Sequence, residues 1–183
     1  MKKVFLTFLI LIILILIILI LTISKETEDV IIPSSAIRFR VIANTNSVED
    51  QNLKLKVRDN VQSKLSTMLV DKKNINEVKT TIQANMLNIE KVVAKTINDS
   101  NNKQTYNINY GKNYFPKKIY KGVTYKAGNY DSLVIKLGNA NGNNWWCVLF
   151  PPLCLLESEE QEAKSNIEYK FFVKELIDKY FNK

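Results

Sequence analysis

Apolar and charged residues alternate from Ile37 to Val41. A period of two is typical of a β-strand with one buried face. Arg38 and Arg40 lie on the opposite, outward face of this strand. We therefore expect both guanidinium groups to be available at the surface.

Three later segments carry apolar residues at three- and four-residue spacing, which predicts amphipathic helices. The first begins at the capping pair Ser47 and Asp50 and runs to about Leu69, and the second runs from residue 74 to residue 97. The third follows a similar capping signal at Ser165 and reaches residue 181.

Further strands are predicted at four places: Tyr106–Tyr110, Val123–Tyr125, Leu133–Leu137 and Trp145–Phe150. The last is expected to pair with the strand before it as a hairpin, and to end at two prolines that cannot donate to a ladder. The order of strand, two helices, several strands and helix predicts an α+β domain with a mainly antiparallel sheet and about three helices. The order of the strands in the sheet does not follow from the sequence.

The N-terminus carries Lys2 and Lys3 ahead of an apolar run from Val4 to Ile23. This run is long enough to span a bilayer as a helix, and the charge asymmetry around it favours an N-in, C-out orientation. We expect residues 1–24 to form a signal or transmembrane segment, 25–35 a linker, and 36–183 a single extracytoplasmic domain. A permanent anchor is favoured over a cleaved signal, because the apolar core is longer than that of most signal peptides.

The composition limits the kinds of binding and catalysis that this chain can perform. The net charge of +8 is spread as single lysines among acids, which argues against nucleic-acid binding, and the sequence has no histidine. Without histidine, the usual general base, the Ser-His and Cys-His nucleophiles and the commonest zinc ligand are missing. We expect no catalytic residue, metal, cofactor or small-molecule substrate.

Cys147 and Cys154 are the only cysteines. An even pair beyond a membrane favours a disulfide. A straight strand would separate their Cα atoms by about 23 Å, so the chain must reverse between them, and Pro151-Pro152 lies where it would do so. Two separately buried thiols remain the alternative.

Trp145 and Trp146 are neighbours on a predicted strand and so point to opposite faces. One can fill the core, while the other is either covered by another element or serves as an aromatic anchor for a partner protein. Similarly, Arg38 and Arg40 either form cross-strand ion pairs or recognise carboxylates of a partner. Both alternatives stay open on the sequence alone.

These same residues carry a resemblance to a known family. The stretches Ala36–Asn44, Asp50–Asp59 in part, and above all Asn144–Cys154 (NWWCVLFPPLC) resemble the stage II sporulation protein R family. The resemblance covers the predicted ectodomain, although residues 71–121 match in pattern only.

The resemblance implies a non-enzymatic signal that is exported from the forespore into the intermembrane space, either anchored or secreted. There it would activate a membrane-embedded aspartic protease, so that pro-sigma-E is processed in the mother cell. The residues expected to bind this partner are Arg38, Arg40, Arg58, Asn144, Trp145 and Trp146.

Two other functions compete with this interpretation. One is an exported cell-wall hydrolase that uses a carboxylate pair from among Asp50, Asp59 and Asp131. The other is a passive module that binds the envelope through its scattered lysines.

Overall fold

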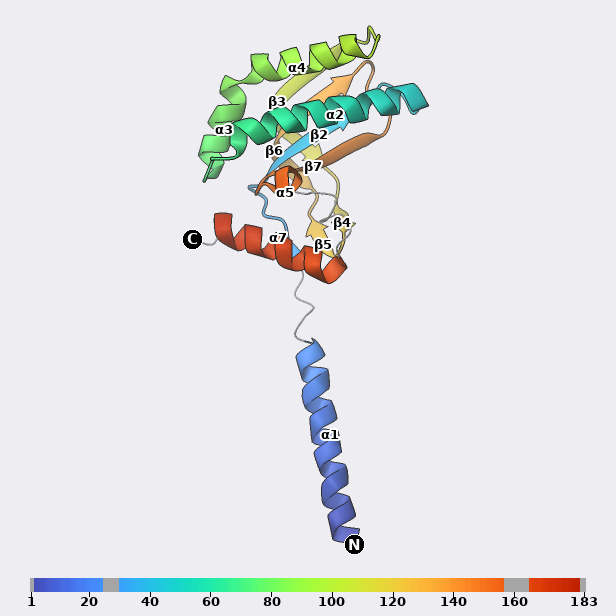
Figure 1. Ribbon diagram of the computed structural model, residues 1–183, viewed down its shortest axis with the longest axis vertical. Helices are drawn as coiled ribbons and strands as arrows, with labels where there is room; N and C mark the ends of the chain where they lie inside the picture. Colours follow the sequence, from blue (N-terminus) through green and yellow to red (C-terminus); the bar gives the residue numbers. More distant parts are fainter. Residues whose placement is uncertain (1, 25–29, 157–164, 182–183) are drawn as a thin grey trace. The chain divides into compact units, whose positions relative to one another are not determined.

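The computed structural model describes residues 2–24, 30–156 and 165–181 (Figure 1). The chain forms two compact units, Met1–Val30 and Ile31–Lys183. The first unit contains helix α1 (Lys2–Ser24), on which the predicted membrane segment falls. The side chains at positions 2–4, 8 and 19–24 of that helix lie outside the described residues. Within the described part of the chain, no helix is both long and apolar enough to cross a membrane. The membrane segment therefore stays a prediction.

The second unit is an α+β fold. Its described helices are α2 (Val48–Leu69), α3 (Ile75–Ala84), α4 (Met86–Asp99), α5 (Leu153–Leu156) and α7 (Asn166–Phe181). Its strands are β1 (Val30–Ile31), β2 (Ile37–Ile42), β3 (Tyr106–Phe115), β4 (Lys118–Tyr120), β5 (Val123–Tyr125), β6 (Gly128–Leu137) and β7 (Asn144–Phe150). The described helices thus outnumber the three expected for this domain.

The main sheet has four strands in the order β3-β6-β2-β7. Two of its pairings are antiparallel, whereas β2 and β6 run parallel. The sheet is therefore mixed, and the predicted hairpin of the last two strands is wrong because β7 pairs with β2. Both edges of β6 are already occupied by β3 and β2. The loop before β7 also bonds to the end of β2, through Gly142 N–H to the Ala43 carbonyl (2.9 Å) and Asn141 N–H to the Asn44 carbonyl (3.0 Å).

Helices α2 and α4 lie side by side over one face of this sheet (Figure 1). Alternate strand residues such as Phe39, Val41 and Ile135 point into this layer and are fully buried. They meet an apolar stripe of α2 that includes Val57 and Val61. This packing produces the alternation and the helical spacing seen in the sequence.

The single helix predicted from residue 74 to residue 97 is interrupted at Asn85. Its backbone angles there, φ −110° and ψ 14°, are not helical, and its side-chain amide donates to the Thr81 carbonyl (2.9 Å). The apolar stripe continues through Ile82 and Ile89 on either side of the break. Periodicity alone could not reveal it.

A smaller sheet with the order β1-β5-β4 lies next to α7. Ile32 N–H donates to the Thr124 carbonyl (3.0 Å), and Ile32 is buried, so the fold begins before the expected boundary at Ala36. Residues 25–29 of the predicted linker lie outside the described residues. Tyr169 of α7 packs its ring edge-on to Tyr120 of β4 at 5.5 Å between centroids.

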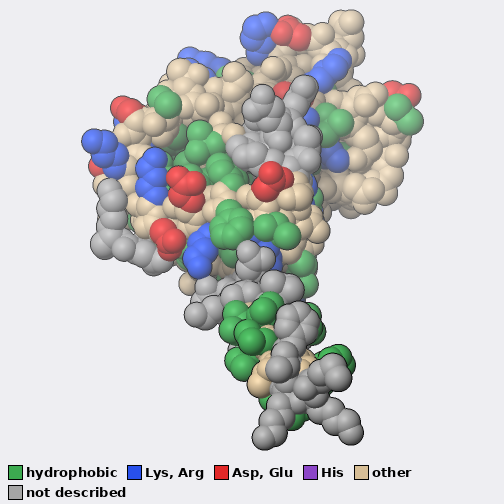
Figure 2. All heavy atoms as spheres, turned by 60° about the horizontal axis from the view of Figure 1, so that its bottom comes forward, with side chains coloured by type: hydrophobic (Ala, Val, Ile, Leu, Met, Phe, Trp, Pro, Cys, Tyr) green, Lys and Arg blue, Asp and Glu red, His purple; other side chains and the backbone are tan. Residues whose placement is uncertain are grey.

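The outer face of α7 carries two exposed apolar side chains, Ile167 and Phe171. On the face shown in Figure 2, hydrophobic side chains are interspersed with charged groups of both signs. This face therefore does not present one continuous apolar patch.

Candidate functional site

A cleft of about 380 Å³ lies along β7. Its lining comes from α2, β4, β5, β7, α5 and α7, which are brought together only by the tertiary fold. It gathers six of the eight residues singled out in the sequence as site or disulfide residues: Arg58, Asn144, Trp145, Trp146, Cys147 and Cys154. Arg38 and Arg40 do not line it.

The two tryptophans reach the cleft from opposite faces of β7. Trp145 lies on the helix side, where its ring meets Phe39 edge-on at 5.7 Å between centroids. Trp146 lies on the other side and meets Phe115 and Tyr125, each at 5.5 Å. Both side chains are half-buried, so each indole combines packing against the fold with a surface in the cleft.

A cationic side chain from a neighbouring element also lies near each indole ring. Arg58 of α2 lies 5.3 Å from the Trp145 ring centroid and forms an ion pair with Asp59 (2.7 Å). Lys118 of β4 lies 5.4 Å from the Trp146 ring and is exposed. Within the described residues, Lys118 forms no ion pair. The cleft therefore offers positive charge to an incoming anionic group.

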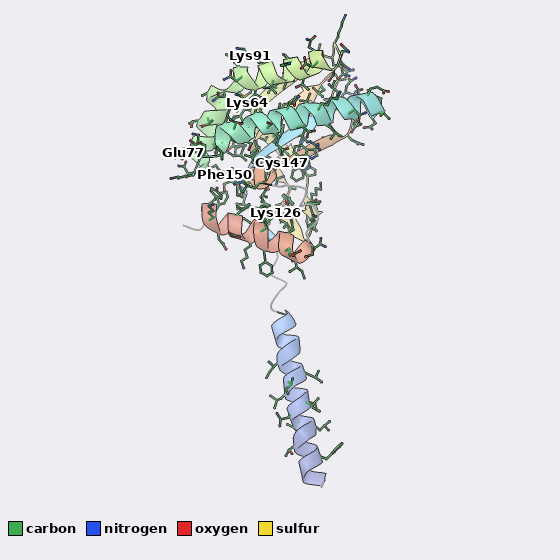
Figure 3. The ribbon with its side chains drawn as sticks, in the orientation of Figure 1. Lys64, Glu77, Lys91, Lys126, Cys147 and Phe150 are labelled. Atoms are coloured by element: carbon green, nitrogen blue, oxygen red, sulfur yellow. A yellow bond between two sulfur atoms is a disulfide. The ribbon has the colours of Figure 1, made fainter. Side chains whose placement is uncertain are left out.

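A disulfide joins Cys147 of β7 to Cys154 of α5, with 5.9 Å between the Cα atoms. The chain reverses between them at Pro151 and Pro152, where the Phe150–Pro151 peptide bond is cis. Figure 3 shows Cys147 and Phe150 on this part of β7, close to α2. Gln62 of α2 donates to the Cys154 carbonyl, which further fixes α5 against the helix layer.

Arg38 corrects the expectation of an outward-facing arginine, because it is fully buried. Its guanidinium lies 3.5 Å from the Tyr130 ring centroid, with the rings of Phe115 and Trp146 at 4.9 and 4.8 Å. It donates to the Lys126 carbonyl (3.4 Å), while its Nε and Nη1 have no hydrogen-bond partner among the described residues. The end of β3 and the segment around β5 cover this face of the sheet, which β-strand periodicity could not predict.

Burial lowers the pKa of Arg38 to about 10. Arg40 is half-buried, stacks at 3.8 Å on Phe115 and donates to the Tyr114 carbonyl (2.9 Å). Burial also lowers the pKa of Arg40. Within the described residues, neither arginine pairs with a carboxylate, so the cross-strand ion pairs that were one of the two alternatives are absent there. Both arginines stack on Phe115, and Arg38 also stacks on Trp146, so they pack against the aromatic residues on this side of β7.

The three acids considered for hydrolase chemistry are bound by separate groups. Thr45 and Asn44 donate to the Asp50 carboxylate (2.5 and 3.2 Å), and the Thr45 bond in particular lowers the pKa of Asp50. Burial would raise the pKa of Asp131, but ion pairs with Lys79 and Lys112 outweigh it and hold that pKa below its usual value.

Of the three carboxylates, only Asp59 lines the cleft. No pair is assembled for acid–base work, and neither lowered pKa suits a general acid at neutral pH. Among the described residues, no cluster of three or more histidines, cysteines, aspartates or glutamates is arranged to hold a metal ion.

Sequence reasoning missed the other side of the cleft, which is formed by Lys118, Tyr120, Tyr125 and Tyr169. These residues come from β4, β5 and α7, far from β7 in sequence. The only local signal was the spacing of Lys118 and Tyr120, which share one face of a strand.

The sequence is similar to that of one known family. The family model "Stage II sporulation protein R (spore_II_R)" matches residues 33–160. Stage II sporulation protein R of Bacillus subtilis (strain 168) is 38% identical over 154 residues, which cover 84% of this chain and 69% of that protein. No solved structure matches the chain.

Proposed function

The chain belongs to the stage II sporulation protein R family, and we propose that it is the exported signal that activates a membrane-embedded aspartic protease during sporulation. Family membership supports a role in sporulation. The finer proposal is that the chain crosses from the forespore into the intermembrane space. There it switches on the protease that removes the pro-sequence of sigma-E in the mother cell.

The cleft along β7 is the observation that carries this proposal. Asn144–Cys154, the segment in which the resemblance to the family was most apparent, forms the strand, the reversal and the disulfide that build one wall of the cleft. Aromatic rings with cations at a partly open surface are typical of protein-binding anchors. This lining supports recognition of a protein partner, which we take to be the protease.

Export is proposed from the sequence of the N-terminal unit. Lys2 and Lys3 precede the apolar residues 4–23, and this asymmetry supports a chain whose N-terminus stays inside while the folded unit lies outside. The folded unit would then meet the protease in the intermembrane space. The chain remains anchored in this proposal, because the apolar run is longer than most signal-peptide cores.

We propose that the chain acts by binding and not by catalysis. The lack of histidine and the lowered pKa values of Asp50 and Asp131 support this view. Purified chain incubated with peptidoglycan is expected to release no soluble fragments. Release that disappears in Asp59→Asn, the variant of an aspartate that lines the cleft, would contradict a purely binding role.

Co-expression tests the proposed function. The chain, the aspartic protease and the sigma-E precursor are produced together in a host that does not sporulate, and precursor cleavage is followed by blot. Cleavage is expected only when the chain is present. Cleavage of equal extent without the chain would remove the activating role.

Charge reversal then tests the role of the cleft. Lys118→Glu is expected to reduce cleavage strongly, because it replaces the cation that lies 5.4 Å from the Trp146 ring with an anion. Lys91→Glu makes the same charge change on the exposed side of α4, away from the cleft (Figure 3), and is expected to leave cleavage unchanged. Equal cleavage by the two variants would place the protease contact elsewhere.

A further inference from the structure

Strand β7 is an edge of the main sheet, since among the described strands β2 alone is its neighbour. Ala43 N–H donates to the Asn143 carbonyl (3.5 Å), and the antiparallel register then pairs Val41 with Trp145 and Phe39 with Cys147. Backbone groups on an antiparallel strand alternate between the two sides. The N–H and C=O of Asn144, Trp146 and Val148 therefore point away from β2.

Only the first part of this outer edge is open. Asn144 is exposed and Trp146 is half-buried, whereas Val148 is buried with its carbonyl 3.1 Å from the Cys154 sulfur. Within the described residues, no hydrogen bond reaches the outer backbone groups of Asn144 or Trp146. The disulfide and α5 thus close the edge at one end and leave a short unpaired stretch, residues 144–146, inside the cleft.

This edge lacks the features that usually prevent pairing with another strand. Natural proteins protect edges with lysine, inward charges or proline. β7 contains no charged residue and no proline between Asn144 and Phe150. The opposite edge, β3, carries Lys112 and four asparagines or glycines in alternation with its apolar residues. The unprotected edge is the one that lies in the cleft.

Charge indicates what kind of strand would fit. Arg58 reaches the cleft beside Trp145, and Lys118 reaches it beside Trp146, so the two cations flank opposite faces of β7. Successive side chains of an extended segment also point to opposite faces. Two adjacent carboxylates on an added strand would therefore each meet one cation, and the carboxylate near Arg58 would share that guanidinium with Asp59 (2.7 Å). A sugar is a poorer fit, because stacking on either indole would compete with the cation already placed near it.

We propose that residues 144–146 of β7 bind an extended acidic segment of a partner protein by adding it to the sheet as a further strand. The backbone groups of Asn144 and Trp146 supply the hydrogen bonds, while Arg58 and Lys118 select adjacent acidic residues. This inference rests on the proposed function in taking the activated protease as the partner. It adds the mode of recognition and the chemistry of the recognised segment.

A peptide probe tests strand addition directly. Fluorescein-labelled Val-Glu-Glu-Val is titrated with the full chain in detergent micelles, and binding is followed by fluorescence polarisation. The same peptide N-methylated at every backbone nitrogen keeps its side chains but loses its donors, and is expected to bind at least about tenfold more weakly. Val-Lys-Lys-Val tests the charge requirement and is expected to show a similar loss. Equal binding of the N-methylated peptide, or no binding of Val-Glu-Glu-Val, would overturn strand addition.

The matched protein variants are Asn144→Pro and Asn144→Ala. Proline removes the outward N–H at the first residue of the strand, where it is tolerated in sheets, while alanine keeps that N–H. Asn144→Pro is expected to weaken Val-Glu-Glu-Val binding at least about tenfold, and Asn144→Ala by no more than about threefold. Equal affinity of the two variants would also overturn the inference. If Asn144→Pro fails to fold, the N-methylated peptide remains the deciding comparison.

The same variants in the co-expression assay separate this inference from the proposed function. A larger loss of precursor cleavage in Asn144→Pro than in Asn144→Ala supports both. Normal cleavage in both variants overturns strand addition while the activating role stands. Cleavage that never depends on the wild-type chain overturns the proposed function, and peptide binding then reports on the edge alone.

Discussion

Arg38 holds a positive charge among three aromatic rings without a described carboxylate to balance it. Such burial is costly unless the cation is weakly hydrated and stacks well, and guanidinium meets both conditions better than ammonium does. The three rings, which we call the aromatic cage of Arg38, therefore favour arginine over lysine at this position. Its long stem also fills space in the layer behind Trp146.

Arg38→Lys is accordingly expected to destabilise the fold by about 1–2 kcal/mol, through lost stacking and a more strongly hydrated buried cation. Arg40→Lys is expected to cost less, because Arg40 is half-buried. Thermal unfolding followed by circular dichroism measures both variants against the wild type. Equal melting temperatures for Arg38→Lys and the wild type would contradict the cage.

Asp50 gives a pH dependence whose sign follows from its lowered pKa. A carboxyl that is more acidic in the folded state stabilises the fold above its unfolded pKa, near pH 4, and loses this contribution as the pH falls through the lower folded value. Asp50→Asn is expected to cost about 1–2 kcal/mol at pH 7 and much less under strongly acidic conditions. Urea unfolding at both pH values tests this. A cost that is the same at both would contradict the role of the ionised carboxylate.

Local signals at the residue scale were readable from the sequence. Ser47 accepts from Asp50 N–H (3.1 Å) and Ser165 from Glu168 N–H (3.3 Å), as the capping patterns predict. The environment of Arg38 was not readable, because it depends on Tyr130 and Phe115, which lie on strands far away in the chain. A helix cap is formed by residues close in sequence, whereas the aromatic cage of Arg38 is formed by residues that only the fold brings together.

At the scale of elements, the disulfide ties α5 to the end of β7 and so limits the open edge. Closing a loop with a sequence separation of 7 residues is expected to stabilise the fold by about 2–3 kcal/mol in the chain-entropy model. The double variant Cys147→Ser, Cys154→Ser should melt earlier. Hydrogen exchange should first become faster in α5 and at the end of β7.

Reduction of the wild-type chain provides the matched control, since it breaks the same bond without a substitution. It should reproduce the exchange pattern of the double variant. Unchanged exchange in α5 under both conditions would show that Gln62 and the packing of Leu153 hold the helix without the disulfide.

The elements themselves were largely predictable, but their pairing was not. Alternation located β2 and β3, and helical spacing located α2 and α7. The partner of β7 depends on which sheet edge is free after β6 has bound two neighbours. The break at Asn85 leaves the apolar stripe intact, so the helical spacing of apolar residues could not reveal the break. The cleft shares this limit, since one side of it comes from β4, β5 and α7.

At the scale of the whole molecule, we propose that the N-terminus stays inside, that residues 4–23 anchor the chain in the membrane, and that the folded unit lies outside. Protease added to intact cells that express the chain is expected to digest the folded unit, because Lys2 and Lys3 favour an inside N-terminus. An external marker protein serves as the digestion control. Full protection of the folded unit while the marker is digested would contradict the topology.

The central claim is that the cleft along β7 contacts the aspartic protease, and photo-crosslinking tests it most directly. A benzophenone amino acid replaces Asn144, which is exposed in the cleft, or Lys91, which is exposed on α4, in cells that also produce the protease. The account predicts a light-dependent adduct of the two proteins from position 144 and none from position 91. An adduct from position 91 with none from position 144 would contradict it.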